Sequence, residues 1–405
     1  MRRAFAAAVL CSALASTATG GARAAAAQPA AAGSAETTFA LALLKQLGGT
    51  DNVVYSPYSI DVALTMADAG AIGQTASQVA QVLGARSADD AVADVEALRS
   101  ALARAVGSGS SAPTLDVANA LWTQSGLALQ QPFASTLTDD FGAPPKSTNF
   151  AGDPAAALQA INAWVSEHTD ALIPSILSRG TITPQTAFVL ANAIYLKAHW
   201  QSPFVASMTR PAAFTTPAGN VVQVPFMNQR DVTYAYAGGA NYQAVELPYS
   251  SSSLSLLAIL PRRKTLAHFE RGLSASVLAG IVGRLGAQSV DLSMPKLDLS
   301  SQEDLNGPLQ KLGMTDAFGP AADFRAVTTQ RSLYISLVEH AAVLKVDEQG
   351  TVAAGATVVI SPTTAVPVPR KPISLILNRP FLLLLRDDGG GNVLFVARVD
   401  NPAQS

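Results

Sequence analysis

Two unusually long apolar stretches constrain the fold of this chain more than any other feature of its sequence. They are FVLANAIYLKAHW at 188–200 and the run from Leu333 to Asp347. The second spans about fifteen residues, whereas strands typically contain five or six. Both faces of both stretches carry mostly apolar side chains, which is the pattern of strands covered on two sides. We therefore expect a large sheet with two long, central, buried strands.

The segment that follows the second stretch, DEQGTVAAGATVVISPTTAVPVPRKP at 347–372, has no evident partner strand in the sequence. No charged residue occurs between Gly350 and Pro369. The first half is built from small and β-branched residues that suit a strand, and the second half is rich in proline, which excludes regular structure. The chain thus carries a strand-competent segment whose place in a sheet is not obvious.

Helical and strand patterns are unevenly distributed along the chain. The apolar spacing predicts helices at 37–47, from Ser59 to Gly70 with Ser56 or Ser59 as the cap, and at 75–84, 88–106, 128–141 and 155–170. It predicts strands at 186–198, 221–226, 242–248, 253–260, 288–294, 332–347, 374–386 and 392–399. Helices first and strands later indicate an α+β fold. We see no internal repeat and no domain boundary.

The N-terminal residues have the features of an export signal. Arg2 and Arg3 precede a short apolar stretch, and Ala-Arg-Ala ends at residue 24. We expect a signal peptide at 1–24, a flexible Ala-rich segment at 25–34 and one domain at 35–405, with the protein secreted to the periplasm or the extracellular space. Cys11, the single cysteine, lies in the signal peptide, so no disulfide is expected. No segment is long and apolar enough to span a membrane.

Several classes of function lack their usual sequence features. No basic cluster points to nucleic acid, and the four histidines do not have the spacing of a metal site. There is no Gly-x-Ser-x-Gly motif and no glycine-rich phosphate loop. SMPK at 293–296 matches the Ser-x-x-Lys of penicillin-binding hydrolases, but Pro295 opposes the helix that this motif needs, and the companion motifs are absent. We expect no catalytic residue, no metal and no cofactor.

Six segments, in order along about 350 residues, resemble the serpin family. They are NVVYSPYSI (52–60), AINAWVSEHT (160–169), LANAIYLKAHW (190–200), SMPKLDL with LQKLGMTDAF, VDEQGTVAAGATVV before the expected reactive loop, and LILNRPFLLLL (375–385). The chain departs from the family pattern at Leu196, Ala198, Val352 and Ala397. None of these departures puts a charge or a large ring into the small-residue segment.

The resemblance implies a serpin fold: one domain with a helix-rich N-terminal part, a large, mainly antiparallel central sheet A, sheets B and C, and an exposed reactive-centre loop at about 348–372. In serpins this loop enters the central sheet after a protease has cut it, as a new strand. The hinge residues implied are Glu348, Gly350, Thr351, Ala353, Ala354, Gly355 and Ala356. In the inserted strand Thr351, Ala353 and Gly355 share one face, and a charge on the core side would be costly to bury. We expect Thr351 to be solvated before cleavage and to enter the sheet first.

The resemblance also implies two clusters around the central strands. Ser56, Ser59, Asn192 and His340 match the family's shutter, a polar cluster beneath the strands. Trp200 matches the breach at the top of the sheet, and Lys296 with Glu348 matches an ion pair there. The simpler interpretations are a satisfied core histidine, an ordinary core tryptophan and a surface ion pair worth ~0–1 kcal/mol.

The function implied is inhibition of a serine-type protease by a monomeric suicide substrate that forms a covalent acyl complex. Counting from Glu348 places the cut at Thr364–Ala365, within Thr363–Val366. A small residue there suits an elastase-like or subtilisin-like protease rather than a trypsin-like one, for which Arg370 is the alternative. The other functional hypotheses are a non-inhibitory serpin acting as a carrier or chaperone and, much less favoured, the penicillin-binding type of hydrolase.

Overall fold

The computed structural model describes residues 35–108, 112–263, 265–351 and 371–404. Its helices are α1 (Ala35–Gln46), α2 (Pro57–Asp68), α3 (Gly73–Leu83), α4 (Ala88–Val106), α5 (Gln131–Asp139), α6 (Pro154–His168), α7 (Leu266–Gly272), α8 (Ala275–Val282) and α9 (Asn306–Leu312), with 3-10 turns η1 (Ala206–Met208) and η2 (Asp316–Phe318). No helix among these residues is long and apolar enough to cross a membrane.

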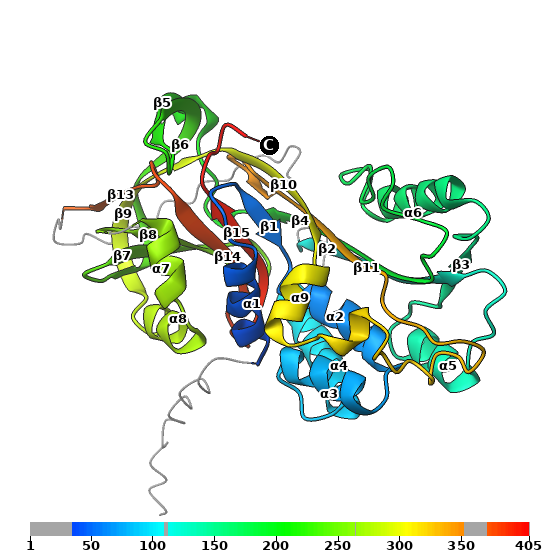
Figure 1. Cartoon of the computed structure of the whole chain (residues 1–405). Coiled ribbons are helices and arrows are strands. Elements are labelled where there is room, and N and C mark those ends of the chain that lie inside the picture. The colour runs from blue at the N-terminus through cyan, green and yellow to red at the C-terminus, as the bar shows by residue number, and fades with distance from the viewer. Residues whose placement is uncertain (1–34, 109–111, 264, 352–370, 405) are drawn as a thin grey trace, which may run out of the picture. The chain divides into compact units, whose positions relative to one another are not determined.

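Within the described residues, six strands form the sheet that contains both long apolar stretches. They are β2 (Thr114–Gln124), β3 (Lys146–Thr148), β4 (Phe188–His199), β10 (Leu297–Asp304), β11 (Leu337–Val346) and β12 (Gly350–Thr351). Their order is β10-β11-β12-β4-β2-β3, and β4 also pairs directly with β11. The expected central strands are therefore β4 and β11, whose residues are almost all buried (Figure 1).

The remaining strands form a second, nine-stranded sheet in the described part of the chain. They are β1 (Val53–Tyr55), β5 (Arg210–Thr215), β6 (Val221–Gly238), β7 (Tyr242–Pro248), β8 (Leu254–Pro261), β9 (Gly286–Pro295), β13 (Ile373–Ile376), β14 (Phe381–Asp387) and β15 (Val393–Val399). Strand β6 pairs with β5, β7 and β9, so it joins into one continuous sheet the strands that we expected to form two. Its register with β9 shifts between Gln229 and Val232, as at a β-bulge.

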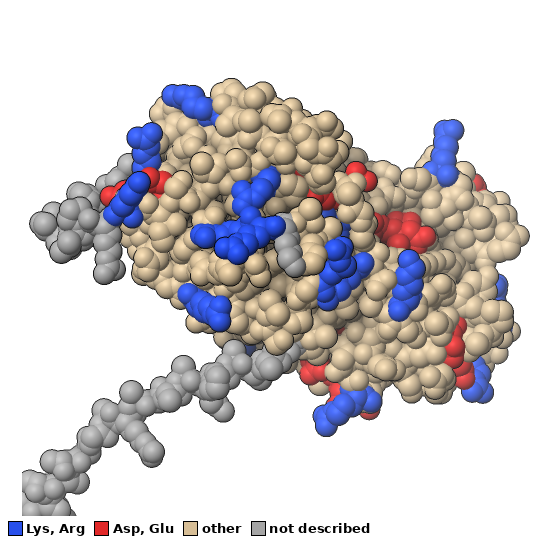
Figure 2. Space-filling model, turned by 60° about the vertical axis from the view of Figure 1, so that its left-hand side comes forward, with Lys and Arg blue, Asp and Glu red and all other residues tan. Residues whose placement is uncertain are grey.

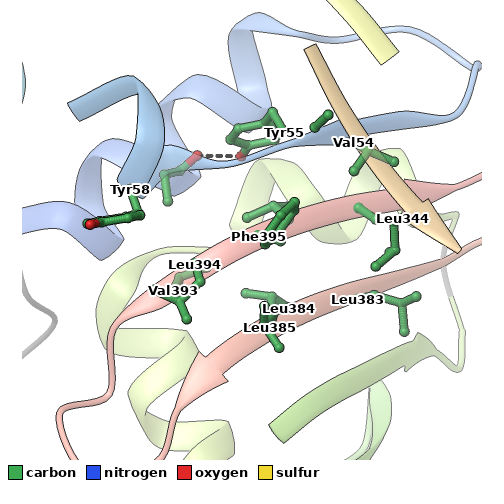
Figure 3. Close-up of a cluster of buried hydrophobic side chains, with 14 of the residues drawn as sticks. Val54, Tyr55, Tyr58, Leu344, Leu383, Leu384, Leu385, Val393, Leu394 and Phe395 are labelled. Atoms are coloured by element: carbon green, nitrogen blue, oxygen red, sulfur yellow. Dashed lines mark hydrogen bonds between the residues drawn. The ribbon is translucent and has the colours of Figure 1, made fainter. Parts of the chain in front are cut away.

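The main core lies between the two sheets and the N-terminal helices. Helix α2 contacts β2 and β4 of the six-stranded sheet and β15 of the other. Figure 3 shows Leu344 of β11 directed toward Leu383 of β14, with Phe395 and Tyr55 in the same apolar layer. Tyr55 is fully buried, and its hydroxyl donates to the Ala40 carbonyl at 2.7 Å. The sheets and α2 are thus fixed to one another by apolar burial, the main favourable term in folding.

A second cluster, the satellite core, lies between α6 and the opposite face of the six-stranded sheet. Ile161 and Val165 of α6 pack there with Ala120 of β2, Ala191 of β4 and Ala341 of β11, all of them buried. Small alanines on the strands let the helix approach the sheet closely. Helix α6 therefore packs against β2 and β4 on the side away from the main core (Figure 1).

Several expected boundaries are wrong. The run from Leu333 to Asp347 is a strand only over Leu337–Val346. The residues before it bond to two separate segments: the Ser336 N–H donates to the Phe188 carbonyl, and the Ile335 N–H donates to the Ala317 carbonyl. The expected strand 374–386 is two strands, interrupted before Phe381 by Pro380, which has no amide hydrogen.

Some elements were not expected at all. Strand β2, next to the central pair, was missed, as were β3, β5, β10 and the helices α7, α8 and α9. The polar side chains of Asp116 and Asn119 interrupt the apolar pattern of β2, which hides its strand character. Of the two candidate caps for α2, the structure uses Ser56, whose hydroxyl accepts from the Ser59 N–H at 3.1 Å.

Candidate functional site

The six-stranded sheet is split at its centre. Strands β4 and β11 pair in parallel only from Val189 to Ile194 and from Leu337 to Ala342. Beyond these residues they diverge, and β12 lies between them, antiparallel to both. Gly350 and Thr351 pair with His199 and Ala198 on one side, and Thr351 pairs with Val346 on the other. The start of the small-residue segment is therefore already a strand of this sheet.

Thr351 is buried, so the expectation that it is solvated before cleavage is wrong. Its exposed fraction is 0%, and its hydroxyl lies 2.6 Å from the Tyr249 hydroxyl. A turn brings it back to the sheet: the Asp347 carboxylate accepts from the N–H groups of Gln349 and Gly350 at 2.8 and 3.1 Å. This side-chain turn, which the sequence Asp-Glu-Gln-Gly allows, is the local reason for the early entry of the hinge.

Gly350 is required by a close approach of two backbones. A Cβ atom at this position would lie 1.9 Å from the Ala198 carbonyl oxygen and 2.9 Å from the His199 Cα. Real Cβ atoms are not found at such distances from backbone atoms, so any other residue would displace β12. The glycine therefore fixes how close the hinge comes to β4.

The predicted breach residues surround this turn. The Trp200 indole N–H donates to the Asp347 carbonyl at 2.9 Å, and its ring stacks on Tyr249 with centroids 4.6 Å apart. Lys296 lies 2.7 Å from the Glu348 carboxylate, which also accepts from the Thr209 hydroxyl at 2.7 Å. Together these contacts hold the start of the hinge from three places: the residue that follows β4, the residue before β5, and the residue between β9 and β10.

The Glu348 side chain is 11% exposed, so it is more enclosed than the usual surface carboxylate. Burial alone would raise its pKa, but the hydrogen bonds from Lys296 and Thr209 outweigh burial and hold the pKa below its ordinary value. The carboxylate therefore stays charged at neutral pH and keeps both partners. Tyr249 and Thr209 were missed from sequence, because nothing local marks their contact with a segment that lies more than a hundred residues away.

The predicted shutter residues form one buried hydrogen-bonded cluster. The Ser56 N–H donates to His340 Nε2 at 3.0 Å, and the Asn192 amide donates to the Ser59 carbonyl at 2.8 Å. His340 Nδ1 also bonds to Asn192 Oδ1. The cluster has a further member, Asn119 of β2, whose Oδ1 accepts from the Asn192 amide. Asn119 was missed because β2 was missed.

The cluster ties together α2 and the three long strands of the sheet. Asn119, Asn192 and His340 stand in register on β2, β4 and β11, so they point to the same face. Ser56 and Ser59 reach them from the first turn of α2. Each polar group has a partner, which is what burial in a low-dielectric site demands. If β4 and β11 moved apart, the hydrogen bond between Asn192 and His340 would have to be replaced by bonds to other groups.

Burial lowers the pKa of His340 to about 3, so the ring is neutral in the folded protein at ordinary pH. Unfolded histidine binds a proton near pH 6.5. Between these values the unfolded chain binds more protons, so acid favours unfolding, and this contribution to stability is lost as the pH falls below about 6.5. We expect the free energy of unfolding of the wild type to fall more steeply from pH 7 to pH 4.5 than that of His340→Gln, as measured by urea titration.

Burial raises the pKa of Asp61, Asp68 and Asp400 to about 7. Because the folded chain then binds more protons than the unfolded chain below this pH, these carboxyls increase the free energy of unfolding as the pH falls, opposite to His340. Because they are present in both proteins, the difference between the two pH profiles isolates His340. Parallel profiles would contradict the neutral, buried ring.

The remaining predicted hinge and reactive-bond residues lie outside the described residues. They are Ala353, Ala354, Gly355, Ala356, Thr364 and Ala365. Among the described residues, no group of three or more His, Cys, Asp or Glu side chains is arranged to hold a metal ion. The arrangement around the split therefore consists of packing and hydrogen bonds that position a strand.

Comparison with known proteins gives the family. Residues 34–402 match the family model described as serpin, serine protease inhibitor. The chain is 31% identical to the leukocyte elastase inhibitor of Sus scrofa, over 91% of this chain and 98% of that one. It is 34% identical to Iripin-2 of Ixodes ricinus, over 90% and 92% of the two chains.

Solved structures agree. A complex of thyroxine-binding globulin with thyroxine superposes with a TM-score of 0.80 at 28% identity, covering 91% of this chain and 98% of that one. The native state of the thermophilic serpin tengpin gives the same TM-score at 27% identity, covering 91% and 93%. The α+β class predicted from the order of helices and strands, and the serpin fold implied by the motifs, are thus confirmed. The chain belongs to the serpin family.

Proposed function

We propose that the chain is a secreted, monomeric inhibitor of a serine-type endopeptidase and acts as a suicide substrate. The protease cuts the reactive-centre loop at Thr364–Ala365 and becomes acylated. The loop from Gly350 onward then enters the central sheet, and the tethered protease is carried away before it can deacylate. The proposed domain spans 35–405 with the loop at about 348–372, and the signal peptide at 1–24 accounts for export.

The pairing of β12 is the observation that carries this proposal. Gly350 and Thr351 already lie between β4 and β11 and run antiparallel to both. Extending the same register would replace the parallel contact of β4 with β11 by two antiparallel ones, which are the more stable kind. The residues that would follow are Val352, Ala353, Ala354, Gly355 and Ala356, small enough to pass between packed strands. The breach and shutter residues line this path at its start and its middle.

The choice of target rests on the residue before the cut. Thr364 is small and β-branched, which suits a shallow specificity pocket of the elastase or subtilisin type. The similarity to a leukocyte elastase inhibitor supports the same class. Arg370, which would suit a trypsin-like protease, lies further on and would leave a longer tether.

A panel of serine proteases tests the function and the bond together. We expect an elastase-like or subtilisin-like enzyme to form a complex that survives boiling in dodecyl sulfate and to release a fragment that begins at Ala365. Denaturing gels report the complex, and mass spectrometry reports the fragment. A fragment beginning at Lys371 from a trypsin complex would overturn both the bond and the target class.

A carrier function is the second candidate, because a relative of similar structure is solved as thyroxine-binding globulin with thyroxine. A carrier needs no covalent complex. Cleavage without any trapped protease across the whole panel would favour it over inhibition.

A further inference from the structure

A basic cavity lies far from the split in the sheet. It has a volume of about 510 Å³, within the range of pockets that bind small molecules. It is lined by the turn after β8, the start of α7, the residues before β14 and the end of β15. Neither the breach nor the shutter residues contribute to it.

Three arginines on its wall have no acidic partner. Arg262, Arg263 and Arg379 form no ion pair with any carboxylate in the part of the chain that the structure describes. A fourth, Arg398, is buried and paired with Glu270 at 2.9 Å. Figure 2 shows basic side chains gathered near the centre of this face. The formal charge of the whole chain is −2, so this local excess of positive charge is not a general property of the surface.

Arg379 is held in place by three hydrogen bonds, and Arg262 has one long contact to the protein. Arg379 donates from Nε and Nη2 to the Pro261 carbonyl at 3.2 and 2.8 Å, and from Nη1 to Asn378 at 3.4 Å. These bonds use three of its five N–H groups and leave two. Arg262 is 3.4 Å from the Tyr236 hydroxyl. Partial burial, and then the charge of Arg262, lower the pKa of Arg379, so the two guanidinium groups repel each other in the absence of an anion.

The rest of the lining is mainly apolar. Pro217, Pro261, Pro380, Leu266 and Ala267 form much of the wall. The other acidic group on it is Asp400, whose pKa burial raises to about 7, so it opposes an anion only weakly near neutral pH. An apolar wall with cationic groups on one side matches an apolar molecule that carries one anionic group.

We propose that this cavity, walled by prolines and lined by Arg262, Arg263 and Arg379, is a binding site for a small organic anion. The ligand class is a carboxylate or sulfonate on an apolar body, with the guanidinium groups on the anion and the body against the prolines. The site is independent of loop cleavage, so it does not depend on the proposed inhibitory function.

The test uses 8-anilinonaphthalene-1-sulfonate, a fluorescent aromatic sulfonate, on the uncut full-length protein. We expect saturable binding of one probe per chain, displaced by dodecanoate and not by dodecanol or by inorganic sulfate at equal concentration. Displacement by dodecanol would show that the charge is not recognised, and displacement by sulfate would show that the apolar body is not. Either result would overturn the proposed ligand class.

The matched variants are Arg262→Gln with Arg379→Gln, and Arg284→Gln as the control, because Arg284 is exposed and does not line the cavity. We expect the double variant to bind the probe at least tenfold more weakly, since each charged hydrogen bond contributes about a factor of ten, and the control to be unchanged. If the double variant does not fold, Arg262→Gln with Arg263→Gln changes only exposed side chains. Equal affinity of that pair and the control would overturn the site.

Discussion

Cutting the reactive loop with a protease that is not trapped is expected to raise the midpoint of thermal unfolding by roughly 15–20 °C. The inserted strand from Val352 to about Ile360 would bond to β4 and β11 on both sides, and it would replace the shorter parallel contact between them. A net gain of about ten hydrogen bonds at about 1 kcal/mol each corresponds to roughly 10 kcal/mol. At about 2 °C per kcal/mol for a domain of this size, the shift is of the stated order.

Calorimetry of intact and nicked protein measures this shift directly. The control is a nick elsewhere, for example after α4 within the sequence GSGSSAP at 107–113, which leaves the reactive loop continuous. Equal midpoints for intact and loop-nicked protein would contradict a metastable native state and would leave the carrier function as the better explanation.

Thr351→Arg is expected to convert the inhibitor into a substrate and to raise the number of inhibitor molecules consumed per protease inactivated more than tenfold. Thr351 is fully buried and bonded to Tyr249, so a guanidinium cannot be accommodated there without several kcal/mol of desolvation cost. The hinge would leave the sheet before cleavage, and its return would be slow compared with deacylation. Titration of a fixed amount of protease gives the stoichiometry.

The matched control is Thr351→Ser, which keeps the hydroxyl for Tyr249 and adds no volume. We expect it to retain a stoichiometry close to that of the wild type. Thermal unfolding of both variants separates loss of inhibition from loss of the fold. Tight covalent complexes formed by Thr351→Arg would show that insertion does not begin at this residue.

The strands that could be predicted from the sequence are those with long, continuous apolar sequences. Strands β4 and β11 are covered on both sides, so nearly all of their residues are apolar and each strand is easy to recognise in the sequence. Strand β2 lies beside them but contributes polar Asp116 and Asn119 to side-chain hydrogen bonds with β4, and these residues hid its strand pattern. The helices α7, α8 and α9 are seven or eight residues long, too short for a periodic pattern to stand out.

The site was predicted where family motifs cover it and missed where partners come from distant elements. Ser56, Ser59 and Asn192 lie in quoted motifs, His340 lies in the long apolar run that precedes the hinge, and the structure brings the four together. Tyr249, by contrast, reaches Thr351 only because strands far apart in sequence pair at the split. The burial of Thr351 depends on this tertiary contact as well as on the local turn at Asp347, and the tertiary contact cannot be read from the local sequence.

Because the satellite core beneath α6 is separate from the main core, this helix can detach without unfolding of the whole domain. Ile161 and Val165 pack on alanines of the sheet and not on the main core, so detaching the helix exposes far less apolar surface than unfolding the domain. Its amide hydrogens should therefore exchange through a partial opening that leaves the two sheets intact. The same partial opening would uncover the sheet face beneath α6 without disturbing the main core, so the two faces of this sheet differ in how easily solvent can reach them.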